Sequence, residues 1–250
     1  MNAPEYLVLY TVAGSIGMIA AVLLGLRRAL VKAGRPAREA NATTAVAALV
    51  VVGWFAGTAG LAWLGAYEGA GGIPTIQFGI LVPVLVGAML WRLPAVMRIV
   101  DAVPQQWLVG IQLYRVLGFV FVVLWAAGSL PGLFALPAGL GDLAVGLLAP
   151  LVALAYARNP AAHAGSVQAW NAAGVADLAI ALATGLLTSP SPFQLFAFDA
   201  PNALIDKFPL VLIPVFVVPL SILLHIASLA KLRRAAAPAL RPGDAAAAPA

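Results

Sequence analysis

The sequence predicts an all-α membrane protein with seven transmembrane helices, its N-terminus outside and its C-terminus in the cytoplasm. Of the 250 residues, 63% are hydrophobic and only 9% are charged, whereas a soluble domain has about 45–50% apolar and about 25% charged residues. A soluble fold of this length cannot bury so much apolar surface, so the solvent must be lipid. The apolar runs are long and continuous instead of alternating, which favours helices over a β-barrel.

Seven apolar stretches have roughly the 20 residues that a helix needs to cross the hydrocarbon core. They form a single domain over residues 1–234, and the residues from 235 to 250, rich in Ala and Pro, are expected to be a disordered cytoplasmic tail. We place the helices at residues 6–26, 44–66, 75–91, 107–128, 138–156, 167–187 and 209–230.

The first three helices are expected to serve as a scaffold, because they hold no internal charge. In the second helix, Gly53 and Gly57 have the G-x-x-x-G spacing that lets two helix backbones approach closely. Pro83 predicts a bend in the third helix, since a proline inside a helix removes a backbone hydrogen bond.

The last outer loop and the seventh helix are the most irregular parts of the sequence. The loop, residues 188–208, is rich in Pro and Phe, which indicates an aromatic belt at the membrane interface or a lid over the bundle, with a short helix capped by Asp199. Pro209, Pro214 and Pro219 predict a bent or interrupted seventh helix. Such a helix is either a kink stabilised by packing or the border of a binding site.

The distribution of basic residues determines the orientation. Of the fourteen Lys and Arg residues, twelve fall in the odd-numbered loops or at the C-terminal end, which the positive-inside rule places in the cytoplasm. Lys207 alone falls in an even-numbered loop, and Arg115 lies inside a helix. The twelve are Arg27, Arg28, Lys32, Arg35, Arg38, Arg92, Arg98, Arg158, Lys231, Arg233, Arg234 and Arg241.

The expected partners follow from the same topology. The chain is embedded in the lipid bilayer, and the basic first loop is suited to anionic lipid headgroups at the cytoplasmic face. The net charge of +5 is explained by the helix ends, so nucleic acid is not an expected partner. With no Cys and only two His, no metal site and no cofactor are expected. The sequence specifies no oligomeric state, and its preference for Ala, Gly and Arg indicates a GC-rich bacterial genome and hence the inner membrane.

Three charges inside the predicted helices are the strongest candidates for a functional site. Residues 139–147 and 174–182 both fit the pattern G-x-x-D-L-A-[VI]-small-L, which places Asp142 and Asp177 in apolar helices. Counted at about 1.5 Å per residue, Arg115 and Asp177 lie near the membrane midplane and form the natural ion pair. Asp142 is expected nearer the outer surface, either joining the pair through water or facing an outer vestibule. A charge at the midplane costs roughly 2.5–3.5 kcal/mol, so these residues should face the bundle.

Other polar residues at helical spacing extend this face. Gln112 lies one turn before Arg115, and Asn171 lies on the face of helix six that also holds Gly174 and Asp177. In helix seven, His225 is the middle of a polar stripe at i, i+4 and i+7, which Ser221 and Ser228 complete. One cluster lined by helices four to seven is therefore expected, built from Arg115, Asp177, Asp142, Gln112, Asn171 and His225.

Two resemblances bear on function. Gly139-Leu140-Gly141-Asp142 resembles the GxGD motif of intramembrane aspartyl proteases, which implies a catalytic pair of aspartates. Here the second aspartate follows the motif instead of preceding it, and the predicted depths of Asp142 and Asp177 differ. The stretches 111–115, 136–142 and 208–214 resemble a set of uncharacterised bacterial seven-helix integral membrane proteins, which implies no activity.

The favoured hypothesis is a small-solute or proton-coupled transport or binding protein with no enzymatic activity. It predicts a water-accessible cavity that touches both Arg115 and Asp177. The alternative is a structural or assembly subunit in which the charges only lock the helices together. A third hypothesis is the GxGD-type protease.

Overall fold

The computed structural model describes residues 5–68 and 75–236, and this part of the chain is helical with no strand. Two helices are irregular, a 3₁₀-helix η2 (Ile111–Phe119) and a π-helix η3 (Ile213–Val217). The α-helices are α1 (Glu5–Lys32), α2 (Ala37–Trp63), α3 (Thr75–Leu90), α4 (Pro94–Ala102), α5 (Gln105–Gly110), α6 (Val120–Ala126), α7 (Gly132–Arg158), α8 (Pro160–Thr188) and α9 (Val218–Ala236).

Within the described part of the chain, six helical segments are long and apolar enough to cross a membrane. Two of them are composite, since α5, η2 and α6 form one segment over Gln105–Ala126 and η3 continues into α9. The expected third span is α3, which has only 16 residues and reaches about 24 Å at about 1.5 Å per residue. It qualifies as a seventh span only together with α4, and the two are bent by 94° at the intervening turn. The structure therefore supports six spanning helices, or seven if α3 and α4 together form one span.

The boundaries of the last helix and its preceding loop differ from the prediction. Residues 209–211 form turns, and the continuous helical segment made of η3 and α9 runs from Ile213 to Ala236, so residues 235 and 236 are helical rather than part of a tail. The rest of the expected tail, 237–250, lies outside the described residues, as does Arg241. No helix forms at Asp199, since residues 189–203 consist of bends, turns and irregular backbone.

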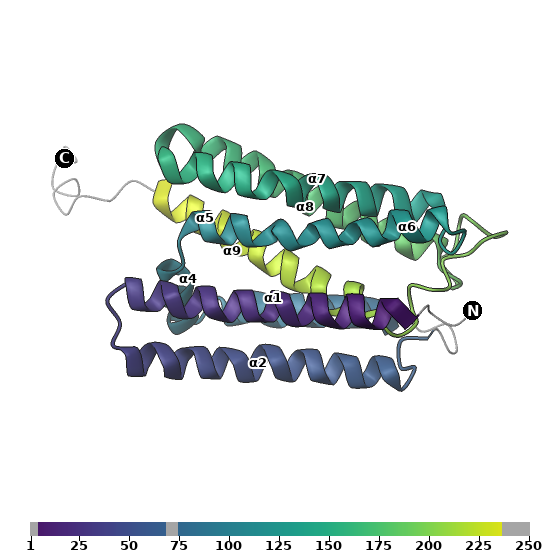
Figure 1. Ribbon diagram of the computed structural model, residues 1–250, viewed down its shortest axis with the longest axis horizontal. Coiled ribbons are helices and arrows are strands. Elements are labelled where there is room, and N and C mark those ends of the chain that lie inside the picture. Colours follow the sequence, from purple (N-terminus) through teal and green to yellow (C-terminus); the bar gives the residue numbers. More distant parts are fainter. Residues whose placement is uncertain (1–4, 69–74, 237–250) are drawn as a thin grey trace, which may run out of the picture.

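The helices form two layers with a central pair of segments between them (Figure 1). α1 and α2 lie on one side, α7 and α8 on the other, and α5–α6 and α9 run between them. The α1–α2 loop, α4 and the C-terminal end of α9 lie at one end of the bundle, which we call the C-terminal end, and the start of α1 lies at the opposite, N-terminal end. The most buried of the six segments is Ile213–Ala235, consistent with its central place.

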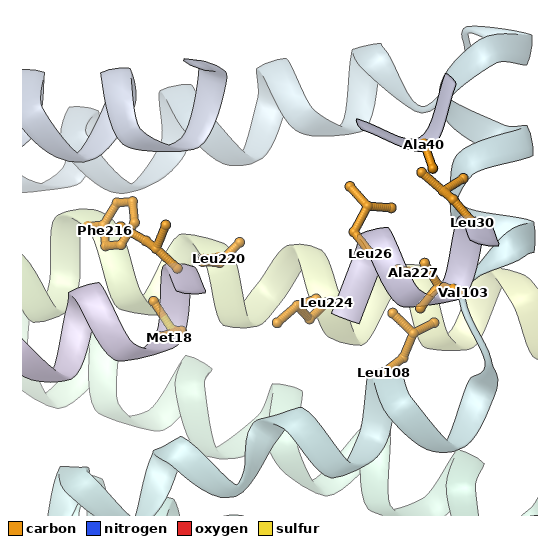
Figure 2. Packing of buried hydrophobic residues seen from close by; sticks show 12 residues of the cluster. Met18, Leu26, Leu30, Ala40, Val103, Leu108, Phe216, Leu220, Leu224 and Ala227 are labelled. Carbon is orange, nitrogen blue, oxygen red and sulfur yellow. The ribbon is translucent and has the colours of Figure 1, made fainter. Parts of the chain in front are cut away.

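The largest apolar core cluster holds the central helix against the α1 layer (Figure 2). Phe216, Leu220 and Leu224 from η3 and α9 belong to one cluster with Met18, Leu26 and Leu30 of α1. Phe216 is fully buried and contacts the rings of two α2 aromatics, with centroids 4.7 and 5.0 Å apart. Since lipid is as apolar as these side chains, close packing rather than exclusion from water stabilises this contact.

A tight hairpin joins α7 and α8. Asn159 separates the two helices, its side-chain oxygen accepts a hydrogen bond from the amide of Ala162 at 3.1 Å, and Pro160 begins α8. An Asn cap followed by Pro at the first helical position is a strong start signal for a helix. Because the turn is this short, residues at equal sequence distance from Asn159 lie at the same depth in the bundle.

Candidate functional site

The candidate site is built around the 3₁₀-helix in the middle of the composite segment. A 3₁₀-helix has three residues per turn, so every third side chain lies on one face. Gln112, Arg115 and Gly118 follow this spacing, and these three are the buried residues of η2. The 3₁₀ winding thus places the Gln112 amide, the Arg115 guanidinium and Gly118, which has no side chain, on the buried face of η2.

Arg115 binds both candidate carboxylates directly. Its Nε donates to Oδ1 of Asp142 at 2.7 Å, and its Nη2 donates to Oδ2 of Asp177. Nη1 lies 3.3 Å from the carbonyl oxygen of Gly174 and 3.0 Å from Nε2 of His225. The Arg115 side chain is 1% exposed, whereas those of Asp142 and Asp177 keep 16% and 13%. The cluster therefore contains one guanidinium held by two helices of the hairpin and by α9.

The hairpin explains why the two carboxylates meet. Asp142 lies 16 residues before Arg158, the last residue of α7, and Asp177 lies 17 residues after Pro160, the first residue of α8. At about 1.5 Å per residue, both carboxylates lie about 25 Å from the turn. This corrects the expected separation of the two carboxylates along the bundle: α7 begins at Gly132 rather than near residue 138, so Asp142 lies further inside its helix than expected and level with Asp177.

Glycines on three helices provide the space that the cluster occupies. A Cβ atom at Gly118 would overlap Oδ2 of Asp142, and one at Gly141 would overlap Oδ1 of Asp177. At Gly174 it would overlap the His225 ring and lie 3.1 Å from Nη1 of Arg115. Gly141 and Gly174 of these patterns thus have a packing role, since they make room for polar side chains of the cluster, whereas Gly139 lies against Val122.

A file of buried hydrogen-bonded groups continues from Arg115 toward the C-terminal end of the bundle. Since Nη1 of Arg115 can only donate, Nε2 of His225 accepts, and Nδ1 of the neutral ring donates to Oδ1 of Asn171 at 2.9 Å. Nδ2 of Asn171 donates to Oγ of Ser228 at 2.8 Å, and Nε2 of Gln105 donates to the same oxygen at 2.6 Å. His225, Asn171 and Ser228 have no exposed surface. The file joins the charged cluster to the first residue of α5.

A second, shorter branch leaves η2 toward α9. Nε2 of Gln112 donates to the carbonyl oxygen of Ser221 at 3.3 Å, and the hydroxyls of Tyr114 and Ser221 are 2.5 Å apart. The π-helix η3 lies directly before this part of α9. The cluster thus lies between two irregular helical segments, and π-helical and 3₁₀ turns inside helices are frequent at functional sites.

Two cavities reach the cluster, and Asp142 lines both. The smaller one, about 50 Å³, lies between α1, η2 and the last segment, and Arg115, Tyr10 and Ser15 also line it. A water needs about 10–15 Å³ of such space, so this cavity has room for a few water molecules. The larger one, about 310 Å³, extends toward the N-terminal end between α3 and α8.

The cavities agree only in part with the expectation from sequence. They reach Arg115 and Asp142, but Asp177 lines neither of them. The first and third helices, expected to be scaffold, contribute Thr11 and Ser15 of α1 and Gln77 of α3 to the cavity walls. The i, i+4 spacing of Thr11 and Ser15 in an otherwise apolar stretch was a sequence signal for this. Gln105 had no such signal, since it precedes the expected fourth helix.

The charges of the cluster do not balance. Arg115 contributes one positive charge, Asp142 and Asp177 contribute two negative charges, and His225 is neutral in the observed hydrogen-bonding pattern. The formal sum is one negative charge. Among residues 5–68 and 75–236, no group of three or more His, Asp or Glu side chains is placed to hold a metal ion. Burying an uncompensated charge is costly, so the site suits a proton or another cation.

Together, the apolar helices and the buried cluster define a helical protein of the membrane-embedded type with an internal ionic site. Residues 73–233 match the family described as a domain of unknown function (DUF8737), and the chain belongs to this family. The matched region runs from α3 to α9 and includes Arg115, both aspartates and the polar file. No curated protein and no solved structure matches the chain.

Proposed function

We propose that the chain is a multi-pass protein of a bacterial inner membrane that binds a small solute and transports it in a proton-coupled manner. In the proposed orientation the N-terminal end of the bundle faces outward and the C-terminal end faces the cytoplasm. The basic α1–α2 loop, which lies at the C-terminal end, supports this orientation. The same loop is the proposed contact for anionic lipid headgroups.

The observation that carries the proposal is the position of Asp142. Asp142 lines both cavities, its carboxylate is bound by Arg115, and its side chain is 16% exposed. Arg115 in turn connects it to the buried polar file that ends at Gln105. A carboxylate that is accessible from one end and linked by hydrogen bonds to the other end is the arrangement expected of a coupling site in a transporter.

The test is proton movement in liposomes that contain the purified chain. A membrane potential negative inside should acidify the interior faster than in protein-free liposomes, as read by an enclosed pH-sensitive dye. Asp142→Asn should remove the protein-dependent part. Asp101→Asn is the matched control, because it neutralises an exposed carboxylate that pairs with Arg234 outside the cluster. Acidification no faster than in protein-free liposomes at either sign of the potential would overturn the proton-coupled proposal.

One observation favours the alternative of a structural or assembly subunit. Arg115 uses four hydrogen bonds on four partners and is 1% exposed, so it also locks α7, α8 and α9 to η2. The neutral variant Arg115→Met, Asp142→Asn, Asp177→Asn separates the two functions. If the charges only lock the helices, this variant should fold and keep whatever transport the native chain shows. If they form a coupling site, it should fold and lose transport.

The geometry gives little support to the aspartyl-protease hypothesis. Asp142 and Asp177 do approach each other, since both bind the same guanidinium. An aspartyl dyad works because two carboxylates share one proton. Here Arg115 donates to each of the two carboxylates, an arrangement that differs from a dyad whose carboxylates hydrogen-bond each other through a shared proton. We propose no enzymatic activity.

A further inference from the structure

The larger cavity has a lining that indicates what kind of solute it accepts. Its volume of about 310 Å³ is within the range of about 300–1,000 Å³ that small-molecule sites occupy. The start of α3, the end of α8, the following loop and η3 form its walls, with Phe121 and Phe134 from the α6–α7 side. Most of this surface is apolar, so the body of a ligand must be apolar as well.

Among the described residues, the charged side chains that line this cavity are Asp142 and Asp206, and none is Lys or Arg. Asp206 already has an interaction within the protein, so Asp142 is the carboxylate that a ligand would meet. Asp142 belongs to the cluster whose formal charges leave one negative charge uncompensated. A cationic ligand therefore gains electrostatic stabilisation at this end of the cavity, whereas an anionic ligand would add to the imbalance.

The aromatic residues of the wall add a second preference for positive charge. Tyr67, Phe121, Phe134 and Phe193 line the cavity, and the face of an aromatic ring attracts an organic cation. A small inorganic cation would instead need several oxygen ligands. Carboxylate, aromatic rings and an apolar wall together match an alkyl- or aryl-substituted ammonium group.

The cavity opens on the apolar flank of the bundle between α3 and α8. Leu81 of α3 and Phe193 of the loop after α8 line it and are 54% and 50% exposed, so this side is not closed by protein. Ser189 and Ser191 lie at the loop end of the same wall. An opening with an apolar flank and a polar loop suits a molecule that partitions into the membrane with its charged group near the headgroups.

From these observations we infer that the cavity between α3 and α8 binds a hydrophobic organic cation, an amine or quaternary ammonium, with its positive group against Asp142 and its apolar body between the two helices. The inference rests on the proposed function, of which it names the substrate class.

The test is binding of benzyldimethylhexylammonium to the purified chain in lipid nanodiscs, compared with the neutral isostere in which carbon replaces the charged nitrogen. The cation should bind saturably and at least about tenfold more tightly than the isostere, since a charge-assisted contact is stronger than a neutral one. Asp142→Asn should weaken binding of the cation about tenfold and leave the isostere unchanged. Equal affinity for both molecules, as expected of a site for lipid chains, overturns the inference.

A second pair of variants keeps the test independent of the charged cluster. Ala181 of α8 lines the cavity, whereas Ala179 of the same helix is exposed and does not line it. Ala181→Phe should fill part of the cavity and weaken cation binding by about tenfold or more, while Ala179→Phe should leave it unchanged. Binding that neither Asp142→Asn nor Ala181→Phe weakens overturns the inference.

The liposome measurement remains separate from the binding measurement. Proton movement that depends on Asp142, without selective binding of the cation, would refute the substrate class and leave proton-coupled transport standing. Selective binding without proton movement would support the cavity assignment and refute coupling to protons.

Discussion

Replacing Arg115 by Met should destabilise the protein by about 3–5 kcal/mol, the usual cost of removing one partner from a buried ion pair. Met has a similar length and no charge, so the change removes four hydrogen bonds and leaves Asp142 and Asp177 without a counter-charge. The carboxylates keep only 16% and 13% of their surface, so water replaces the guanidinium poorly. The upper part of the range is expected, because two carboxylates rather than one lose their partner.

Equilibrium unfolding in mixed micelles, followed by fluorescence of the six Trp residues, measures this loss. Adding Asp142→Asn and Asp177→Asn to Arg115→Met should recover most of it, since no buried charge then remains. Arg234→Met is the control: it removes a pair whose side chains are 35% and 49% exposed and should cost less than about 1 kcal/mol. At acidic pH the difference in unfolding free energy between Arg115→Met and the native chain should become smaller, because protonation neutralises the Asp142 and Asp177 carboxylates that the variant leaves without a counter-charge. The reasoning is refuted if Arg115→Met costs no more than the control, or if the neutral triple variant is equally unstable.

Two further predictions concern packing and topology. Gly141→Ala should displace the carboxylate of Asp177 and cost about 1–3 kcal/mol of stability through overpacking. At Gly57 an added Cβ meets nothing within 4 Å, so Gly57→Ala should stabilise α2 slightly. Thermal unfolding of the two variants compares these effects, and equal changes in stability would contradict the contact between Gly141 and Asp177. Since the chain has no Cys, a single cysteine at Ala33 or Ser129 can report orientation. A membrane-impermeant thiol reagent applied to intact cells should label Ser129→Cys and spare Ala33→Cys, and the reverse pattern would invert the proposed topology.

Composition and hydropathy were sufficient for much of the fold. The helical class and most of the apolar segments follow from run length alone, because lipid leaves few ways to satisfy the backbone. Run length could not show whether α3 spans the membrane, since it has only 16 residues and is followed by a 94° bend. The position of that bend depends on how α4 packs against the rest of the bundle. Lys231 fixes the end of α4 by donating to the carbonyl oxygens of Asp101 and Val103 at 2.6 and 2.5 Å, a contact across 128 residues or more that no local pattern reveals.

The candidate site was predictable in its members but less so in its geometry. A charge in an apolar run has to face the bundle, which is why Arg115, Asp142 and Asp177 were identifiable from the sequence. Their mutual depth was not, because it depends on where α7 begins. The Asn159-Pro160 signal would have corrected this, since counting from the turn places both aspartates level. The 3₁₀ winding of η2 has no sequence signal that we recognise, yet it aligns Gln112 and Arg115 with Gly118.

The short turn between α7 and α8 also has a consequence for the order in which the protein is made. Arg115 is synthesised 27 residues before Asp142 and 62 before Asp177. Each charge alone costs roughly 2.5–3.5 kcal/mol to insert, so the arginine segment enters the bilayer before its counter-charges exist. A hairpin closed by a single residue delivers both aspartates at one depth in one insertion event. We therefore expect α7 and α8 to enter the bilayer as a unit, and a nascent chain released before α7 is complete would leave Arg115 without a carboxylate partner.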